Sequence, residues 1–300
     1  MTQPATGTLE VPGARIHYEV RGSGPLLLMI PGGPQDAGVL AGQARILADR
    51  YTTVAYDPRG NSRSTLDGEP ADQSVEVHAQ DAARLVAELG GGPARVFGTS
   101  GGAQIGLALA ALRPDLVDTV VAHEPPCVLL LDDPSQALAE DQEVYDTYVR
   151  DGVEAGIARF LGLHDLDTGT GPAGEDTPDG TAQEDSGPAP QSAAAENTVD
   201  AEDAEDAETF ARVSRNFGYF LGHGLRPLSR YVPDTATLRT GVPRVVVGLG
   251  RESAGRTIHD IGLALAGALA TDPVEFPGDH VGFESHPDDF AGALDRALRG

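Results

Sequence analysis

The sequence has little of several things that many classes of protein require. It has one cysteine, Cys127, and no tryptophan among its 300 residues. A single cysteine cannot form an intramolecular disulfide. The chain has 21 basic against 46 acidic side chains and a formal net charge of −25, so phosphate backbones and anionic membrane surfaces would repel it. We therefore expect no nucleic-acid partner and no membrane partner, and the oligomeric state stays open.

Long apolar runs are also missing. No segment reaches transmembrane length, and residues 1–10 contain neither the basic stretch nor the apolar stretch of a secretory signal. The sequence therefore predicts a soluble, cytoplasmic protein. Its length suits one large α/β domain with an inserted subdomain, or two ordinary domains.

The most informative stretch that is present is Gly98-Thr99-Ser100-Gly101-Gly102, between a strand-like run and a helix-like run. G-x-S-x-G in this context is typical of a nucleophile elbow, a turn so sharp that the serine adopts strained backbone angles and its neighbours must be small. The turn lifts the hydroxyl clear of the sheet, above the positive end of the following helix. Ser100 is therefore the predicted nucleophile, and Cys127 is not needed as one. The alternative is a glycine-rich loop that happens to contain serine.

Strand-like and helix-like segments alternate along much of the chain. The predicted strands are 7–11, 14–20, 26–30, 52–56, 95–97, 118–122, 243–249 and 273–276. The predicted helices are 39–48, 75–89, 104–112, 135–161, 256–270 and 288–298, and residues 209–231 are expected to be ordered. This alternation predicts an α/β fold, with a mostly parallel eight-stranded sheet and helices on both of its faces.

A helical cap is expected to interrupt this core over residues 126–240, so that residues 1–125 and 241–300 form the core. Within the cap, residues 165–208 hold many acidic side chains, no Lys or Arg, and no apolar side chain larger than valine after Leu166. Such a stretch buries too little apolar surface to offset the entropy lost on ordering. We predict a disordered acidic loop at about 167–207, and a solvated insertion is favoured over a partner-binding arm. Its last residues, 201–208, could form a short helix.

A serine hydroxyl needs a general base within hydrogen-bond reach. Among the eight histidines, His280 follows the last predicted strand, at the carboxyl end of the sheet, where the sites of open parallel sheets gather. It also fits the chain order serine, acid, histidine. His280 is therefore the predicted base, and a loop histidine without a role is the alternative. His123 could line the pocket, and His286 is interpreted as a helix-flanking residue.

Two carboxylates compete to orient this histidine, a role that requires a buried carboxylate at the far imidazole nitrogen. Glu252 follows the strand predicted at 243–249 and lies between Ser100 and His280 in the sequence, and it is the favoured candidate. Glu124 follows the strand predicted at 118–122 and is the second candidate.

Acyl transfer also needs backbone donors for the developing oxyanion. One is expected from Gly101, the residue after the nucleophile, and the other from Gly33 in the loop 31–34. Glycine lets the backbone turn its N–H inward without a Cβ in the way. The alternative interpretation of the loop 31–34, a tight turn leading into a helix, is compatible with this role. We expect no metal site and no cofactor.

These motifs resemble the α/β-hydrolase superfamily over essentially the whole chain apart from the acidic loop. The loop 31–34 is similar to a His-Gly-Gly-Pro oxyanion loop, with proline in place of histidine. Residues 56–64 resemble the Asp-x-Arg-Gly-x-Gly-x-Ser turn after the fourth strand, with Ser62 where glycine is usual. The elbow and the stretches 123–126 and 278–280 also match. The resemblance implies the fold more specifically than the substrate, because the fold hosts many chemistries.

Some members of that superfamily are disfavoured. Epoxide hydrolases and haloalkane dehalogenases resemble this chain but have aspartate where Ser100 stands, and the absence of tryptophan excludes a Trp-built halide site. Prolyl aminopeptidases have a similar two-glycine loop, which continues with glycine where this chain has Gln35. No peptidase activity is therefore assigned.

The favoured function is a serine hydrolase that cleaves an uncharged carboxylic ester, lactone or thioester, a small-molecule substrate, through an acyl-enzyme. One alternative is a cofactor-free enzyme of the same fold that performs C–C hydrolysis or perhydrolysis. The other is a non-catalytic binding or receptor protein. The cap sets the substrate, which the sequence does not name.

Overall fold

The computed structural model describes residues 3–90, 92–163 and 193–300. One sheet of nine strands runs through these residues, in the order β1-β2-β4-β3-β6-β7-β8-β9, with β5 paired to β2. Its strands are β1 (Ala5–Val11), β2 (Ala14–Arg21), β3 (Leu26–Ile30), β4 (Thr52–Tyr56), β5 (Thr65–Leu66), β6 (Ala94–Thr99), β7 (Val117–His123), β8 (Arg244–Gly250) and β9 (Val274–Phe276).

The sheet is mostly parallel, as predicted. Neighbouring strands are parallel from β4 across to β9, whereas β2 pairs antiparallel with β1, β4 and β5. All eight predicted strands are present, which confirms the predicted fold class. The additional strand, β5, has two residues, too few to show an apolar periodicity.

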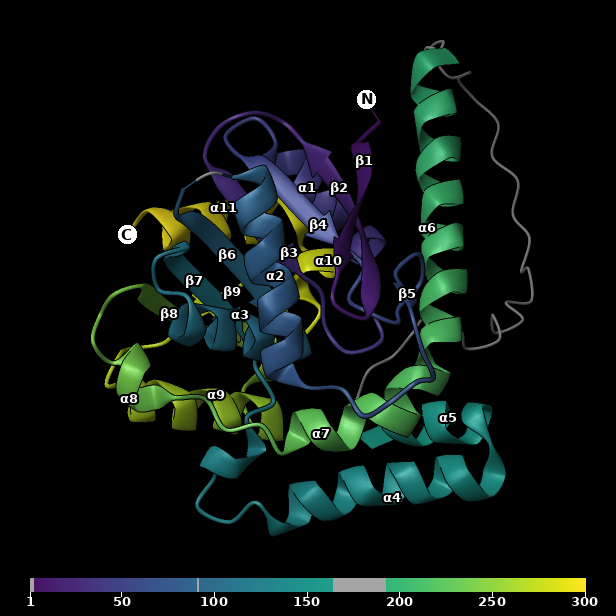
Figure 1. Cartoon of the computed structure of the whole chain (residues 1–300), viewed down its shortest axis with the longest axis vertical. Helices are drawn as coiled ribbons and strands as arrows, with labels where there is room; N and C mark the ends of the chain where they lie inside the picture. The colour runs from purple at the N-terminus through teal and green to yellow at the C-terminus, as the bar shows by residue number, and fades with distance from the viewer. Residues whose placement is uncertain (1–2, 91, 164–192) are drawn as a thin grey trace, which may run out of the picture.

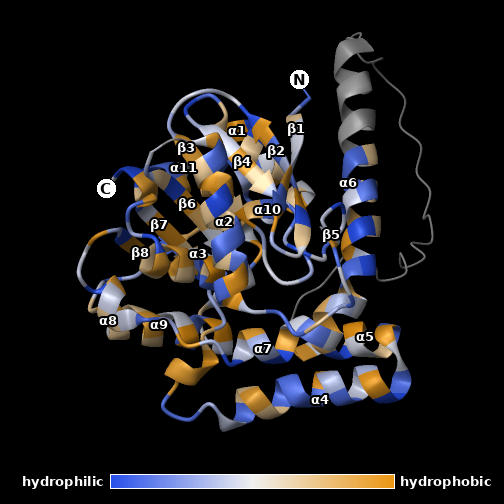
Figure 2. Cartoon of the chain, in the orientation of Figure 1, coloured by the Kyte–Doolittle hydropathy of each residue, from blue (hydrophilic) through white to orange (hydrophobic). Residues whose placement is uncertain are grey.

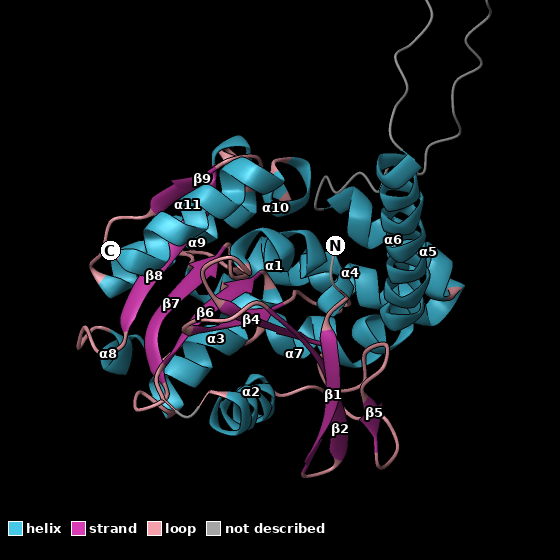
Figure 3. Cartoon of the chain, turned by 90° about the horizontal axis from the view of Figure 1, so that it is seen from above, coloured by secondary structure: helices cyan, strands magenta, loops and turns pink. Residues whose placement is uncertain are grey.

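Helices cover both faces of this sheet (Figure 3). The helices of the core are η1 (Ala37–Leu40), α1 (Ala41–Leu47), α2 (Val75–Leu89), α3 (Gly101–Leu112), η4 (Arg251–Ser253), α9 (Thr257–Leu269), α10 (Gly282–Ser285) and α11 (Pro287–Arg299). Each face has its own apolar core because side chains alternate along a strand. In β3, Leu28 and Ile30 join the core under α2, α3 and α9, whereas Leu27 and Met29 join the core under α1 and α11. Figure 2 shows the resulting apolar centre of the molecule.

The segment between β7 and β8 is helical where the structure describes it, and we call it the helical insertion. Its helices are η2 (Val128–Leu130), α4 (Ser135–Asp151), α5 (Val153–Leu163), α6 (Ala193–Tyr219), the π-helix η3 (Phe220–Gly224), α7 (Leu225–Ser229) and α8 (Thr235–Leu238). Helices α4, α5 and α7 lie together at one end of the sheet, and α6 stands along its side (Figure 1). Within the described residues, no helix combines the length and apolar composition that spanning a bilayer requires.

Two segments of the helical insertion are each divided into several helices in the structure. The helix predicted at 135–161 is divided at Gly152, whose φ of 93° lies in the left-handed region that glycine tolerates and that ends α4. The segment 209–231, which was expected to be ordered, continues α6 as far as Tyr219, changes at Phe220 into the π-helix η3, and then forms α7. Such π-turns occur inside helices at functional sites, and η3 lies beside the candidate site.

The predicted acidic loop is wrong over residues 193–200, because α6 begins at Ala193, whereas the short helix expected at 201–208 is present as part of α6. The rest of the predicted loop, residues 167–192, lies outside the described residues. Alanine and glutamate have high helix propensity. In addition, the Glu205 carboxylate lies 3.2 Å from the Arg45 guanidinium and 3.6 Å from that of Arg21. These ion pairs hold the helix against the core, which composition alone does not reveal.

Candidate active site

The strand–turn–helix predicted around Ser100 is present. Ser100 precedes α3 with φ 52° and ψ −126°, a conformation that non-glycine residues adopt only under strain. Its neighbours must be small. A Cβ on Gly98 would overlap the Gly102 carbonyl, and a Cβ on Gly102 would overlap the Ile30 carbonyl. The close packing of β6, α3 and β3 therefore sets the sharp turn that presents the serine.

The two predicted oxyanion donors lie side by side. The Gly33 nitrogen is 3.3 Å from the position that a Cβ on Gly101 would take. Among the described residues, no backbone or side-chain acceptor is hydrogen-bonded to the N–H of either glycine. Gly101 is also the first residue of α3, where the helix dipole favours negative charge. Both N–H groups are thus available to a developing oxyanion.

The loop that contains Gly33 is held by Asn61, a residue that the sequence analysis did not single out. Asn61 Nδ2 donates to the Gly33 carbonyl at 3.0 Å and to the Gln35 carbonyl at 2.9 Å. The Gln35 side chain in turn accepts the N–H of Gly32 at 2.9 Å. Asn61 lies in the turn after β4, at one of the variable positions of the motif, so the pattern gave no reason to choose it.

The neighbouring Ser62 shows how this chain departs from the glycine usual at that position. Ser62 keeps a positive φ of 48°, and the amide of Asn216, from α6, compensates for the strain. Asn216 Oδ1 accepts the Ser62 N–H at 2.8 Å. Asn216 Nδ2 donates to Ser62 Oγ at 2.9 Å and to the Pro34 carbonyl at 2.7 Å. The helical insertion is therefore bonded directly to both loops.

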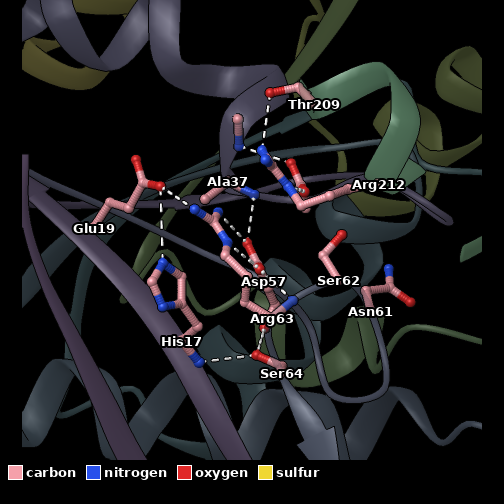
Figure 4. Close-up of polar contacts among 12 residues, drawn as sticks. His17, Glu19, Ala37, Asp57, Asn61, Ser62, Arg63, Ser64, Thr209 and Arg212 are labelled. Carbon is pink, nitrogen blue, oxygen red and sulfur yellow. Dashed lines mark hydrogen bonds and ion pairs between the residues drawn. The ribbon is translucent and has the colours of Figure 1, made fainter. Parts of the chain in front are cut away.

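A buried ion network lies behind these loops (Figure 4). The Arg63 guanidinium binds Asp57 at 2.8 and 2.9 Å and Glu19 at 2.7 Å. Burial alone would raise the pKa of Glu19, but its contacts with His17 and Arg63 lower it to about 2. The Asp57 carboxylate also accepts the Ala37 N–H at 3.0 Å. The network therefore joins the loop after β4 to the loop after β3.

His280 is paired with Glu124. Its Nδ1 lies 2.8 Å from Glu124 Oε2, and the other oxygen of Glu124 accepts the Gly250 N–H at 2.8 Å. Glu124 is fully buried and has a positive φ of 47°. Burial alone would raise the pKa of Glu124, but the contact with His280, followed by lesser contributions that include the Gly250 N–H, lowers it to about 2. The carboxylate is therefore ionised at neutral pH and fixes the imidazole with Nδ1 protonated.

Glu252, the favoured acid in the sequence analysis, is not the partner of His280 in the described structure. It lies exposed in η4, and its backbone N–H donates to the Gly278 carbonyl at 2.9 Å. The reason is local: β8 brings Gly250 against the Glu124 carboxylate, and the turn that follows leads Glu252 to the surface. The alternative candidate, Glu124, also fits the chain order serine, acid, histidine.

The other two histidines near the site differ in their surroundings. His123 is fully buried, and its ring stacks on that of His280 with 6.4 Å between centroids. Burial lowers the pKa of His123 to about 4, so it is neutral at physiological pH. His286 precedes α11 and contacts Ser285 Oγ at 2.9 Å, which agrees with its interpretation as a helix-flanking residue.

Ser100, His280, Gly33 and Gly101 line one pocket, which the helical insertion covers. Its apolar lining comes from both the core and the insertion: Pro126, Val128, Ala137, Phe160, Leu163, Phe220, Leu225, Leu228, Ile258 and Ile261. Among the aromatic residues of the helical insertion, Phe160 and Phe220 line the pocket and Phe217 packs against both. Tyr219 instead lies against His223. Within the described residues, no group of three or more His, Cys, Asp or Glu could hold a metal ion.

Comparison with known proteins agrees with this architecture. A family model described as alpha/beta hydrolase fold matches residues 25–165. The hydrolase YraK of Bacillus subtilis (strain 168) is 33% identical over 293 residues, which cover 96% of this chain and 94% of that protein. The 2-(acetamidomethylene)succinate hydrolase of Mesorhizobium japonicum is 39% identical over 110 residues, 36% of this chain and 39% of that protein.

A solved structure shows the same fold. The thermophilic esterase from Thermogutta terrifontis superposes with a TM-score of 0.69 at 18% identity, over 99% of this chain and 98% of that one. The full-length match to a hydrolase agrees with the parallel sheet and with the sharp turn after β6. The chain is therefore a hydrolase that belongs to the α/β-hydrolase superfamily.

Proposed function

We propose that this protein is a serine hydrolase that cleaves a carboxylic ester, lactone or thioester through an acyl-enzyme. The observation that carries the proposal is the pair formed by His280 and the buried Glu124 carboxylate, in a pocket that Ser100 also lines. A base oriented by an acid, next to a serine in a strained turn, is the arrangement that activates a hydroxyl as a nucleophile.

In the first half of the reaction, Ser100 Oγ attacks the carbonyl carbon of the substrate while His280 Nε2 takes the hydroxyl proton. Glu124 holds the ring in the required tautomer and stabilises the imidazolium that forms. The carbonyl oxygen becomes an oxyanion, which accepts hydrogen bonds from the N–H groups of Gly33 and Gly101. His280 then returns the proton to the leaving alkoxide or thiolate as the tetrahedral intermediate collapses.

In the second half, water replaces the leaving group. His280 Nε2 takes a proton from this water, which attacks the acyl carbon, and the same two N–H groups bind the second oxyanion. Collapse of that intermediate returns the proton to Ser100 Oγ and releases the carboxylic acid. No cofactor is needed at any step.

We further propose that residues 126–240 act as a cap that selects the substrate. The apolar pocket lining favours an apolar acyl or alcohol group, because binding removes such a group from water. The π-helix η3 supports this role, because its Phe220 packs against Gly33. A Cβ added to Gly33 would lie 2.7 Å from the Phe220 ring. The same residue thus bounds both the oxyanion loop and the pocket.

A fluorophosphonate probe and a series of p-nitrophenyl esters with acyl chains of increasing length test the proposal. We expect the probe to label Ser100 and the esters to be hydrolysed, with kcat/KM rising with chain length until the apolar pocket is filled. The Ser100→Ala variant should keep the fold and lose both labelling and turnover. A labelled serine without ester turnover would favour the same triad in another reaction, such as C–C hydrolysis or perhydrolysis.

A further inference from the structure

A carboxylate lies where the fold calls for an apolar side chain. On α4, the buried stripe runs through Ala137, Asp141, Val144 and Tyr148, at helical spacing. Asp141 is only 7% exposed. A charged residue at a core position lowers stability, and such residues are typical of functional sites. The proposed ester hydrolysis does not use this one.

The hydrogen bonds of Asp141 are incomplete. Its Oδ2 lies 2.5 Å from Ser229 Oγ, and the same hydroxyl lies 2.7 Å from the Leu225 carbonyl. A hydroxyl has one hydrogen to donate, so it cannot satisfy both acceptors when Asp141 is ionised. Among the described residues, Asp141 Oδ1 accepts no hydrogen bond. The only donor to the buried carboxylate among the described residues is therefore one hydroxyl, which the Leu225 carbonyl also approaches.

Asp141 and Ser229 line the same pocket as Ser100, and their position relative to the nucleophile is fixed. Gln104 Nε2, from α3, donates to the Leu228 carbonyl at 3.0 Å. The Leu228 side chain lies 3.5 Å from the position that a Cβ on Gly101 would take. Since Ser229 is the next residue, its hydroxyl and Asp141 form a fixed wall of the pocket on the side of the helical insertion.

Among the described residues, no basic side chain forms an ion pair with the Asp141 carboxylate. Glu140 also lines the pocket and accepts a hydrogen bond from neutral Gln136 at 3.0 Å. The positive charge of the exposed Arg230 offsets only a small part of the effect of burial on Asp141. Arg256 lines the opposite, core side of the pocket, where its guanidinium lies 3.5 Å from the Asp279 carboxylate. Burial, offset in part by the Ser229 hydrogen bond, raises the pKa of Asp141 to about 6.

We propose that Asp141, together with Ser229, forms a subsite for an alkylammonium group at the end of the substrate remote from the ester. This inference rests on the proposed function and narrows it: the scissile group is uncharged, and the remote end is a cation that donates hydrogen bonds. An ammonium would supply both the donors and the opposite charge that the buried carboxylate lacks. A neutral hydroxyl would supply a donor and leave the charge unpaired.

Binding of hexylammonium and of hexanol to the whole protein at pH 8 tests the subsite without requiring turnover. Isothermal titration calorimetry on the wild type should give an affinity for hexylammonium at least about tenfold higher than for hexanol, the advantage expected of a charge-assisted hydrogen bond over a neutral one. Asp141→Asn should abolish that preference. Asp146→Asn, which removes the same charge from the exposed face of α4, should keep it.

Equal binding of the two probes to the wild type, or a preference that survives Asp141→Asn, would overturn the proposal. Ser229→Ala provides a second variant should Asp141→Asn fail to fold. It keeps the carboxylate and removes its protein donor, so the ammonium preference should be as large or larger, and its loss would contradict the subsite. If wild-type protein shows the preference and cleaves no ester, the subsite stands and the proposed function is wrong.

Discussion

Glutamine in place of Glu124 removes one of two acceptor oxygens that the structure uses. Oε2 faces His280 Nδ1 at 2.8 Å, and Oε1 accepts the Gly250 N–H at 2.8 Å. A glutamine side chain has a single acceptor oxygen and an NH₂ group that only donates. Whichever way it turns, one of the two N–H groups faces another donor in a fully buried position.

The two orientations predict different losses, and each loss can be measured. With the oxygen toward Gly250, the NH₂ group forces the imidazole into the wrong tautomer and kcat falls about ten-thousandfold, as for loss of the acid in other triads. With the oxygen toward His280, the Gly250 N–H is buried without an acceptor, at a cost of about 1–3 kcal/mol in the free energy of unfolding, and the imidazolium still loses its counter-ion.

The assay is kcat for a p-nitrophenyl ester together with urea unfolding, for Glu124→Gln and for the control Glu252→Gln. Glu252 is exposed, so its variant should match the wild type in both. The pKa of Glu124 is lowered from 4.5 to about 2, so its ionisation stabilises the fold above pH 4.5 by about 3 kcal/mol. That contribution is lost as the pH falls toward 2, and the gap in stability between wild type and Glu124→Gln should narrow there. Loss of activity in Glu252→Gln with full activity in Glu124→Gln would refute the reasoning.

Three further predictions concern the base, the oxyanion loop and the buried acid. His280→Ala should lower kcat by about several powers of ten, whereas His286→Ala should change it little; equal losses in ester assays would contradict the choice of base. Asn61→Ala should lower kcat by about tenfold to a hundredfold with little change in KM, because it loosens the loop that presents the Gly33 N–H to the oxyanion. An increase in KM alone would show that Asn61 serves substrate binding instead. The pKa of Asp141 is raised from 3.8 to about 6, so its ionised form destabilises the fold above pH 6; Asp141→Asn should therefore raise the free energy of unfolding at pH 8 by about 2–3 kcal/mol. This gain should fade toward pH 4, and a variant less stable than wild type at pH 8 would contradict the account.

Much of the sheet could be predicted because its signal is local. The run Leu26–Ile30 is continuously apolar and forms a strand buried on both faces. The predicted helix 75–89 has the bounds of α2, with Ser74 capping its first turn. The turn at Gly98–Gly102 could also be predicted from the sequence, because close packing on either side of Ser100 requires small residues there.

The acid could not be chosen from sequence because both candidates follow parallel strands at the same end of the sheet. What separates them is the direction of the side chain. Glu124 has a left-handed backbone conformation and a buried carboxylate, whereas Glu252 lies in an exposed turn. No periodicity or spacing encodes that difference.

Contacts between segments far apart in the chain also could not be predicted from the sequence. Asn216 supports Pro34 and Ser62, from which it is separated by 182 and 154 positions. Glu205 in α6 pairs with Arg45 from 160 positions away. Local composition predicted disorder for residues 193–200, which belong to α6, because composition does not reveal the ion pairs that hold Glu205 of this helix against the core.

The central claim, an acyl-enzyme on Ser100, is tested most directly by mass spectrometry of the protein quenched with acid during turnover of a p-nitrophenyl ester. The account predicts that the mass of one acyl group is added to the peptide that contains Ser100, and that neither the adduct nor turnover is found with Ser100→Ala. An acyl group on another residue, or turnover that persists in a folded Ser100→Ala variant, would contradict the account.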